Sequence, residues 1–186
     1  MNTRRIEAVG AKSSGADSMN ADSMNEARLR AARKRLADSR DQEDAIDGLR
    51  EIVGAFLGSE EMGLFTVDRR TASFRVFWSF GIDLENYDLQ KALGDTGHQR
   101  VMRGECHINL SGRDHTGKGL AQAFVPIIVA KQTIAIVAIL RLLPQKTAFD
   151  RSDFELFNLL SNEAGPLLFG RDIASAARSD GPEMRA

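Results

Sequence analysis

The hydrophobic pattern of the chain is clearest in residues 123–142, AFVPIIVAKQTIAIVAILRL. Two apolar runs rich in Ile and Val flank the polar trio Lys131-Gln132-Thr133. Short β-branched runs on either side of a polar turn are typical of strands rather than of a helix. The pattern therefore predicts a buried β-hairpin. Because polar residues and Pro126 interrupt the apolar run, we do not expect it to span a membrane.

A helix is predicted directly after this hairpin, in FDRSDFELFNLLSNEAG. Ser152 and Glu155 have the Ser-x-x-Glu spacing of a capping box, in which each residue satisfies a free backbone N–H at a helix start. The pair Gly165-Pro166 interrupts the pattern, and proline breaks or kinks a helix. We therefore expect the helix to end near Ala164, a second short helix from Pro166, and a flexible tail over 173–186.

The N-terminal part divides into a polar tail and a helical region. Residues 1–25 are rich in small and polar residues, contain the tandem repeat ADSMN-ADSMN, and are predicted to be disordered. Residues 26–57 contain no proline and are predicted to be helical. Their apolar residues recur at spacings of three and four, which places one stripe on a single helix face. This stripe contains Ile46, Leu49, Val53 and Phe56.

Two strands and a short helix are predicted in the middle of the chain. The strands cover 63–68 and 72–80, and Arg69-Arg70-Thr71 forms the turn between them. Strict alternation would place Phe74, Val76 and Trp78 on one face of the second strand and Phe77 nearer the other. The short helix covers 83–93, with Asp83 as its N-cap and Gly94 at its end.

The stretch from 95 to 119 is polar and punctuated by glycine. We expect a helical turn over 98–102 and a short apolar strand near 108–110. Long connections of this kind often line binding sites, so a pocket is expected here.

Composition narrows the class of protein. A chain of 186 residues is long enough for one core of roughly 120 to 150 residues plus tails. A formal net charge of −1 gives no general attraction to nucleic acid or to anionic membranes. The single cysteine cannot form an internal disulfide, and the N-terminus has no apolar signal-peptide core. We therefore expect a cytoplasmic protein.

Local charge adds one candidate surface. Residues 26–40 contain six Lys or Arg against two acidic residues, which gives +4. Such a stretch can dock on an acidic partner or on nucleic acid. It can equally be the solvated face of a helix that packs in a dimer, and the lack of aromatic residues for base stacking favours this second interpretation.

Several segments together resemble a GAF domain spanning 44–172. GLFTVDRRTASFRVFWSFG resembles the opening hairpin of that family, and VMRGECHI resembles the segment that leads into its pocket. AFVPIIVAKQTIAIVAIL and the following helix resemble the closing part, although Ala135 stands where the family usually has glycine. The resemblance implies an α+β fold, with a GAF/PAS-like central antiparallel sheet flanked by N- and C-terminal helices.

The same resemblance implies where a ligand would bind. In GAF domains a small molecule lies between the sheet and the long connecting segment. Arg113 could pair with a phosphate there, and Trp78 could stack on a ring. The alternative to ligand binding is that Trp78 and Phe124 only pack in the hydrophobic core. The implied lining residues are Trp78, Phe80, His98, Val101, His107, Arg113, His115 and Phe124.

Catalytic and metal chemistry find little support in the sequence. Phytochrome-like GAF domains hold a bilin on a Cys-His pair, but Cys106-His107 has no other bilin pattern around it. The histidines, Cys106 and Asp114 show no tight zinc-binding spacing. GAF domains that reduce free methionine sulfoxide need a second cysteine to resolve the oxidised one. We therefore predict no catalytic residue and no metal, and the sequence names no cofactor.

These expectations combine into one function with an alternative. The chain is predicted to be a non-enzymatic regulator or adaptor in signal transduction. It would form a homodimer through the helix at 26–57 and the closing helix, and it would dock on a signalling protein. The alternative is a sensor that binds a cyclic nucleotide or another metabolite in the GAF pocket. Neither a membrane nor nucleic acid is an expected partner.

Overall fold

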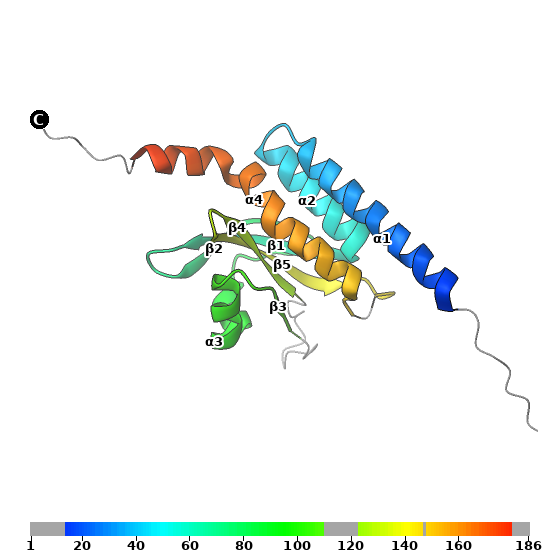
Figure 1. Ribbon diagram of the computed structural model, residues 1–186. Helices are drawn as coiled ribbons and strands as arrows, with labels where there is room; N and C mark the ends of the chain where they lie inside the picture. Colours follow the sequence, from blue (N-terminus) through cyan, green and yellow to red (C-terminus); the bar gives the residue numbers. More distant parts are fainter. Residues whose placement is uncertain (1–13, 110–122, 147, 180–186) are drawn as a thin grey trace, which may run out of the picture.

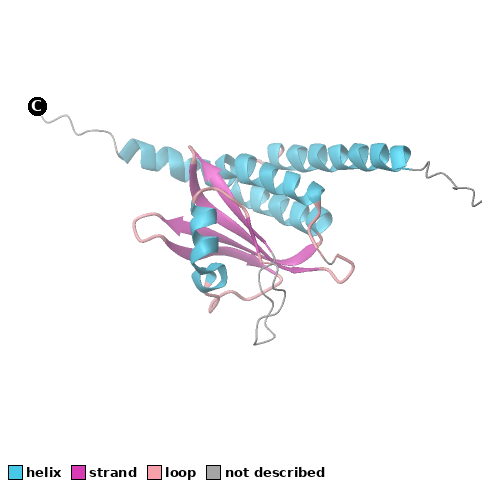
Figure 2. Cartoon of the chain, turned by 60° about the horizontal axis from the view of Figure 1, so that its bottom comes forward, coloured by secondary structure: helices cyan, strands magenta, loops and turns pink. Residues whose placement is uncertain are grey.

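A computed structural model of the chain describes residues 14–109, 123–146 and 148–179. They form a five-stranded antiparallel sheet in the order β2-β1-β5-β4-β3. Helices α1, α2 and α4 lie on one side of the sheet and α3 lies on the other (Figure 1). Figure 2 shows the same layers with α3 turned in front of the sheet. The predicted α+β class with flanking helices is confirmed.

The predicted hairpins form, with small shifts. The strands are β1 (Ser59–Asp68), β2 (Ser73–Phe80), β3 (His107–Ile108), β4 (Ala123–Val129) and β5 (Gln132–Leu142). The β4–β5 turn lies at Ala130 and Lys131, which both have positive φ angles (49° and 65°). Gln132 and Thr133, expected in the turn, belong to β5 instead. The Thr133 hydroxyl is buried and donates a hydrogen bond to the Val101 carbonyl (2.7 Å).

A β-bulge in β2 changes which side chains share a face. Leu64 pairs with Trp78, whereas Phe65 pairs with Val76, so Phe77 is an extra residue in the strand. A bulge interrupts the alternation of side chains between the two faces. Phe74 consequently packs on the α3 side of the sheet, whereas Trp78 packs on the side of the other three helices. The prediction that Phe74, Val76 and Trp78 share one face was wrong.

The N-terminal region is helical over a longer range than the sequence pattern indicated. Helix α1 (Ser14–Ala37) begins within the segment predicted to be disordered, and residues 1–13 lie outside the described part. Helix α2 (Gln42–Leu57) is a separate helix, because residues 38–41 between it and α1 are not helical. Asp41 caps α2 by accepting a hydrogen bond from the backbone N–H of Asp44 (2.9 Å).

Helix α3 (Leu89–Met102) begins later than predicted. Its N-cap is Asp88, which accepts from the backbone N–H of Lys91, while Asp83 only closes a turn with the N–H of Glu85. Gly94 leaves the helical conformation (φ 60°, ψ 178°) at the predicted end of the helix. The chain then resumes the helix up to Met102, which confirms the helical turn expected over 98–102.

Helix α4 (Arg151–Ser179) continues through Pro166, so the break predicted near Ala164 does not occur. Proline removes one helix hydrogen bond, and α4 changes direction along its length (Figure 1). Residues 173–179, predicted as a flexible tail, are helical, whereas 180–186 lie outside the described part.

The start of α4 is capped by a different pair from the one predicted. Asp150 accepts a hydrogen bond from the backbone N–H of Asp153, and Asp153 accepts one from the N–H of Asp150 (3.1 and 2.8 Å). This is the reciprocal arrangement of a capping box, shifted by two residues from Ser152 and Glu155.

Asp153 is also the centre of a buried polar cluster. Its side chain is fully buried and pairs with Lys146 (2.7 Å) and Arg28 (3.3 Å). Arg28 donates in addition to the carbonyl oxygen of Phe56 at the end of α2. The cluster therefore joins α1, α2 and the loop before α4 to the first turn of α4.

The hydrophobic core has two parts, one on each side of the sheet. The larger part lies under α1, α2 and α4. Leu49 and Val53 are fully buried there, and Ile46 and Phe56 pack against the same cluster. The apolar stripe predicted on one face of this helix therefore faces the interior of the monomer.

Candidate ligand face and cavities

The structure brings four of the eight predicted site residues together on the α3 side of the sheet. His98 and Val101 come from α3, His107 from β3 and Phe124 from β4. Trp78 and Phe80 lie elsewhere. Arg113 and His115 fall outside the described residues.

The four residues pack closely against one another and their neighbours. His107 lies opposite Phe124 in the β3–β4 pair, and their rings stack with centroids 5.9 Å apart. Gly97 of α3 backs onto this imidazole so closely that an added Cβ would lie 2.8 Å from its Cδ2 atom. His98 meets the ring of Phe74 edge-on at 5.4 Å. Side chains thus fill the space around the His107 ring.

Two imidazole nitrogens on this face have unused hydrogen-bonding capacity. His98 Nε2 and His107 Nδ1 are buried, and neither has a hydrogen-bond partner among residues 14–109, 123–146 and 148–179. Burial lowers the pKa of His107, and the positive charge of Arg100 lowers it further. His107 is therefore neutral at neutral pH, and its ring can exchange hydrogen bonds with a polar ligand.

Trp78 and Phe80 lie on the opposite face of the sheet. Their rings stack on each other (6.2 Å between centroids), and the guanidinium of Arg50 in α2 lies 5.1 Å from the Phe80 ring. Because of the bulge at Phe77, these rings point toward the three-helix layer. The prediction that they line one pocket with His98 and His107 was wrong, because the sheet separates them.

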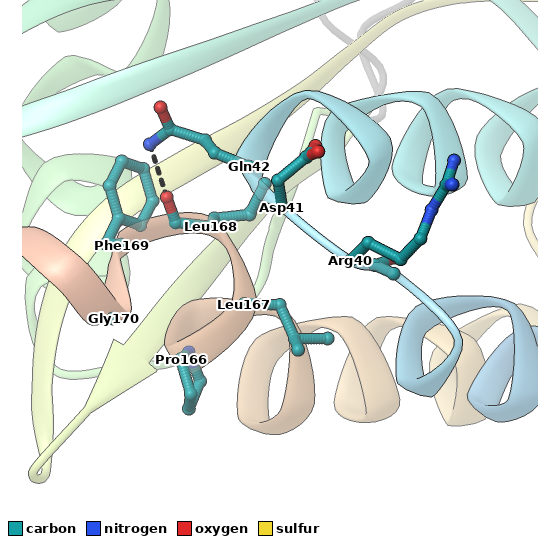
Figure 3. A pocket seen from close by; sticks show the side chains of 9 residues that line it. Arg40, Asp41, Gln42, Pro166, Leu167, Leu168, Phe169 and Gly170 are labelled. Atoms are coloured by element: carbon teal, nitrogen blue, oxygen red, sulfur yellow. Dashed lines mark hydrogen bonds between the residues drawn. The ribbon is translucent and has the colours of Figure 1, made fainter.

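Two cavities occur at places that the sequence did not indicate. The larger, about 330 Å³, lies between the α1–α2 connection and α4 (Figure 3). Gln42 spans it by donating a hydrogen bond to the Leu168 carbonyl. The second, about 220 Å³, lies between β2 and the start of α3, beside Phe74, Val76 and Tyr87. None of the eight predicted residues lines either cavity. The only sequence signal for the larger one was Pro166 within a helical pattern.

Cys106 is predicted to react slowly. Burial raises the pKa of its thiol to about 11, from an ordinary value of 9.0, although Arg100 acts in the opposite direction. The reactive thiolate is therefore roughly 100-fold scarcer at neutral pH than for an unperturbed thiol. We expect slow modification by a disulfide reagent in the native protein and fast modification in denaturant. Equal rates in both states would contradict the burial.

The described part of the chain holds no cluster of three His, Cys, Asp or Glu side chains that could bind a metal ion. Within the same residues, no helix has the length and apolar character needed to cross a membrane.

Comparisons with known proteins agree with this architecture at the level of fold. The sequence matches no protein-family model and no curated protein. Among solved structures, the GAF domain of an Acinetobacter phosphoenolpyruvate-protein phosphotransferase is similar, with a TM-score of 0.58 and 16% identity over 86% of this chain and 98% of that one.

Two further solved structures have the same arrangement. A methyl-accepting chemotaxis protein, residues 122 to 287, has a TM-score of 0.55 and 14% identity over 78% of this chain and 99% of that one. The phycoerythrobilin-bound GAF domain of a cyanobacterial phytochrome has a TM-score of 0.57 and 13% identity over 82% and 99%. The chain therefore has the fold of GAF domains, as its two hairpins and closing helix predicted.

Proposed function

We propose that this chain is a signalling regulator without catalytic activity, which acts by contacting other proteins. The observation that carries the proposal is the close packing around His107 on the α3 side of the sheet. Gly97, His107 and Phe124 close together where a GAF ligand was expected. The smaller cavity lies on the same side of the sheet, between β2 and the start of α3, and the larger one lies beside α4, so neither is lined by the predicted site residues. Close packing of the predicted lining residues favours an interaction module over a ligand sensor.

Two further observations support this proposal. The solved structures with the same fold include a chemotaxis protein and a phosphotransferase domain, which favours a regulatory setting. The single cysteine has a raised thiol pKa, so it is a poor nucleophile at neutral pH.

The alternative is a small-molecule sensor, and one observation favours it. A ligand could satisfy the buried nitrogens of His98 and His107, which have no hydrogen-bond partner among the described residues. By the resemblance, Arg113 and His115 would complete such a site. The bilin-bound phytochrome domain shows that a protein of this fold can hold a small molecule.

Thermal unfolding with a panel of cyclic nucleotides and other metabolites separates the two functions. A ligand present at 100 times its Kd adds about 2.7 kcal/mol to the stability of the native state. For a chain of this size, that raises the Tm by roughly 5 to 10 °C. We expect no member of the panel to do so. We also expect native mass spectrometry of protein purified from its host to show no retained small molecule.

A matched pair of variants assigns any ligand that is found. Binding on the α3 face should be lost in His107→Ala and kept in Gln42→Ala, which alters the cavity beside α4. That outcome would contradict the proposed regulator and support the alternative, a small-molecule sensor. Loss in Gln42→Ala alone would place the ligand in the three-helix layer, and it would also contradict the proposal.

A further inference from the structure

We propose that the free edge of β2 is a self-association surface, on which β2 of a second copy pairs in antiparallel orientation. The two sheets would then form one continuous sheet across the dimer. The inference rests on the proposed action through protein contacts, because it names one such contact.

β2 has an unpaired edge. It is the terminal strand of the sheet, and β1 is the one strand that pairs with it. No backbone hydrogen bond joins β2 to any other part of the described chain. The bulge at Phe77 disturbs part of the strand, but residues 73–76 pair regularly with β1. An edge with free N–H and C=O groups is a template for another strand.

The same strand carries an unusual share of exposed apolar side chains. Five large hydrophobic residues are exposed in the described part of the chain, and three of them, Val76, Phe77 and Phe80, belong to β2 (43%, 40% and 37% exposed). Phe77 contacts Phe169 of α4, so the apolar surface continues onto the helical layer. The strand contains no proline, and Arg75 is its one charged residue.

Charge identifies a second copy as the occupant and sets its direction. The turn end of β2 carries exposed Arg69 and Arg70, with the carboxylate of Asp68 near Arg70, while the Phe80 end carries exposed Glu60, Asp83 and Glu85. Arg69, Arg70, Glu60, Asp83 and Glu85 take part in none of the ion pairs found among the described residues. A two-fold axis across β2 would bring the basic end of each copy beside the acidic end of the other. Antiparallel self-pairing is therefore favoured at both ends.

The helices offer less apolar surface for this purpose. The stripe of α2 is buried inside the monomer. Among the described side chains, the exposed large hydrophobics on helices are Met24 and Phe154. Phe154 is 44% exposed, close to the value for Val76, and it lies on a different surface. It is a matched control for the loss of an exposed apolar side chain.

Sedimentation velocity of the full chain over a range of concentrations tests the inference. We expect a reversible dimer, which Val76→Lys weakens by at least about tenfold because it removes an apolar contact at the axis and adds a second pair of like charges beside Arg75. Phe154→Lys should leave the dimer unchanged. Hydrogen exchange of the β2 amides should slow as the protein concentration rises.

Charge reversal gives a second test that does not depend on the apolar residues. Arg69→Glu with Arg70→Glu makes both ends acidic, and Glu60→Lys with Glu85→Lys makes both ends basic. Each double variant should be monomeric at low salt, and a mixture of the two should form a heterodimer. This result cannot arise from unfolding, because two unfolded chains would not restore the complex.

Three outcomes would overturn the inference. They are a wild-type monomer at every concentration, a dimer that survives Val76→Lys and both charge reversals, and a dimer that Phe154→Lys removes. A monomer that binds a different protein along β2 would also overturn it, while leaving the proposed regulatory function intact. A ligand found on the α3 face would contradict the proposed regulatory function. It would leave the inference about the edge of β2 intact.

Discussion

Replacing Asp153 by alanine should lower the free energy of unfolding by about 3 kcal/mol, because it breaks a buried ion pair and leaves its partners uncompensated. The Asp153 side chain is fully buried against Lys146 and Arg28, and it also caps α4 through the N–H of Asp150. The variant loses all three interactions. Chemical denaturation of the two proteins measures the difference.

Glu163→Ala is the matched control for this prediction. The ion pairs Arg28–Asp153 and Arg33–Glu163 both join α1 to α4. The second pair is exposed, at 58% for Arg33 and 37% for Glu163, so water and salt screen it. We expect Glu163→Ala to change stability little. Similar losses in the two variants would show that burial does not decide the strength of these contacts.

Gly81→Ala should destabilise the protein by about 2 to 4 kcal/mol, since it adds backbone strain to a clash with the main chain. Gly81 ends β2 with a φ of 73°, a conformation that L-residues rarely adopt. A Cβ at this position would lie 2.0 Å from the carbonyl oxygen of Glu60. The backbone of β1 would have to move, so relaxation of a side chain cannot relieve the contact.

Gly54→Ala supplies a control of opposite sign. Gly54 lies inside α2, and the nearest atom to an added Cβ, the Ser59 carbonyl oxygen, is 3.8 Å away, an ordinary contact. Alanine at this helical position should raise stability by about 0.5 to 1 kcal/mol. Thermal or urea unfolding of the two variants gives both values. If both substitutions lowered stability alike, the predicted contact at Gly81 would not be the cause.

The spacing of apolar residues along the chain was sufficient to predict the strands but not how they pair. The runs in 123–142 and 72–80 identified β4, β5 and β2 because a buried strand needs apolar residues wherever it lies. The insertion of Phe77 could not be found in this way, since a bulge depends on how β1 and β2 pair rather than on either sequence alone. Trp78 was therefore assigned to the wrong face.

The predicted helix boundaries were wrong for a related reason. Both Asp150–Asp153 and Ser152–Glu155 fit the spacing of a capping box. The first pair is used because Lys146 and Arg28 meet Asp153, and these contacts are invisible in the local sequence. Similarly, α1 extends into a polar segment that composition alone predicts to be disordered. Near the junction, Asn25 bonds to Glu155 of α4, which is 130 residues away.

The family resemblance placed eight residues in one site, and the structure brings four of them together. His98, Val101, His107 and Phe124 meet on the α3 face, as the resemblance implied. Trp78 and Phe80 do not, because the bulge intervenes. The cavity beside Gln42 was missed because it is created by the junction of two helices that lie far apart in the sequence.

The cluster around Asp153 also has a consequence for the order of events during synthesis. Arg28 and Asp153 are 125 residues apart. The central strand β5 pairs with β1 from far along the chain, for example Val137 with Leu64. Contacts of such long range form slowly, because the chain must close a large loop first. Helix α1 can contact α2 early, through Arg35 with Asp44 and Glu51, but its ion pairs with α4 can form only after α4 has been made. Part of the α1 surface must therefore stay uncovered during most of the synthesis of the domain.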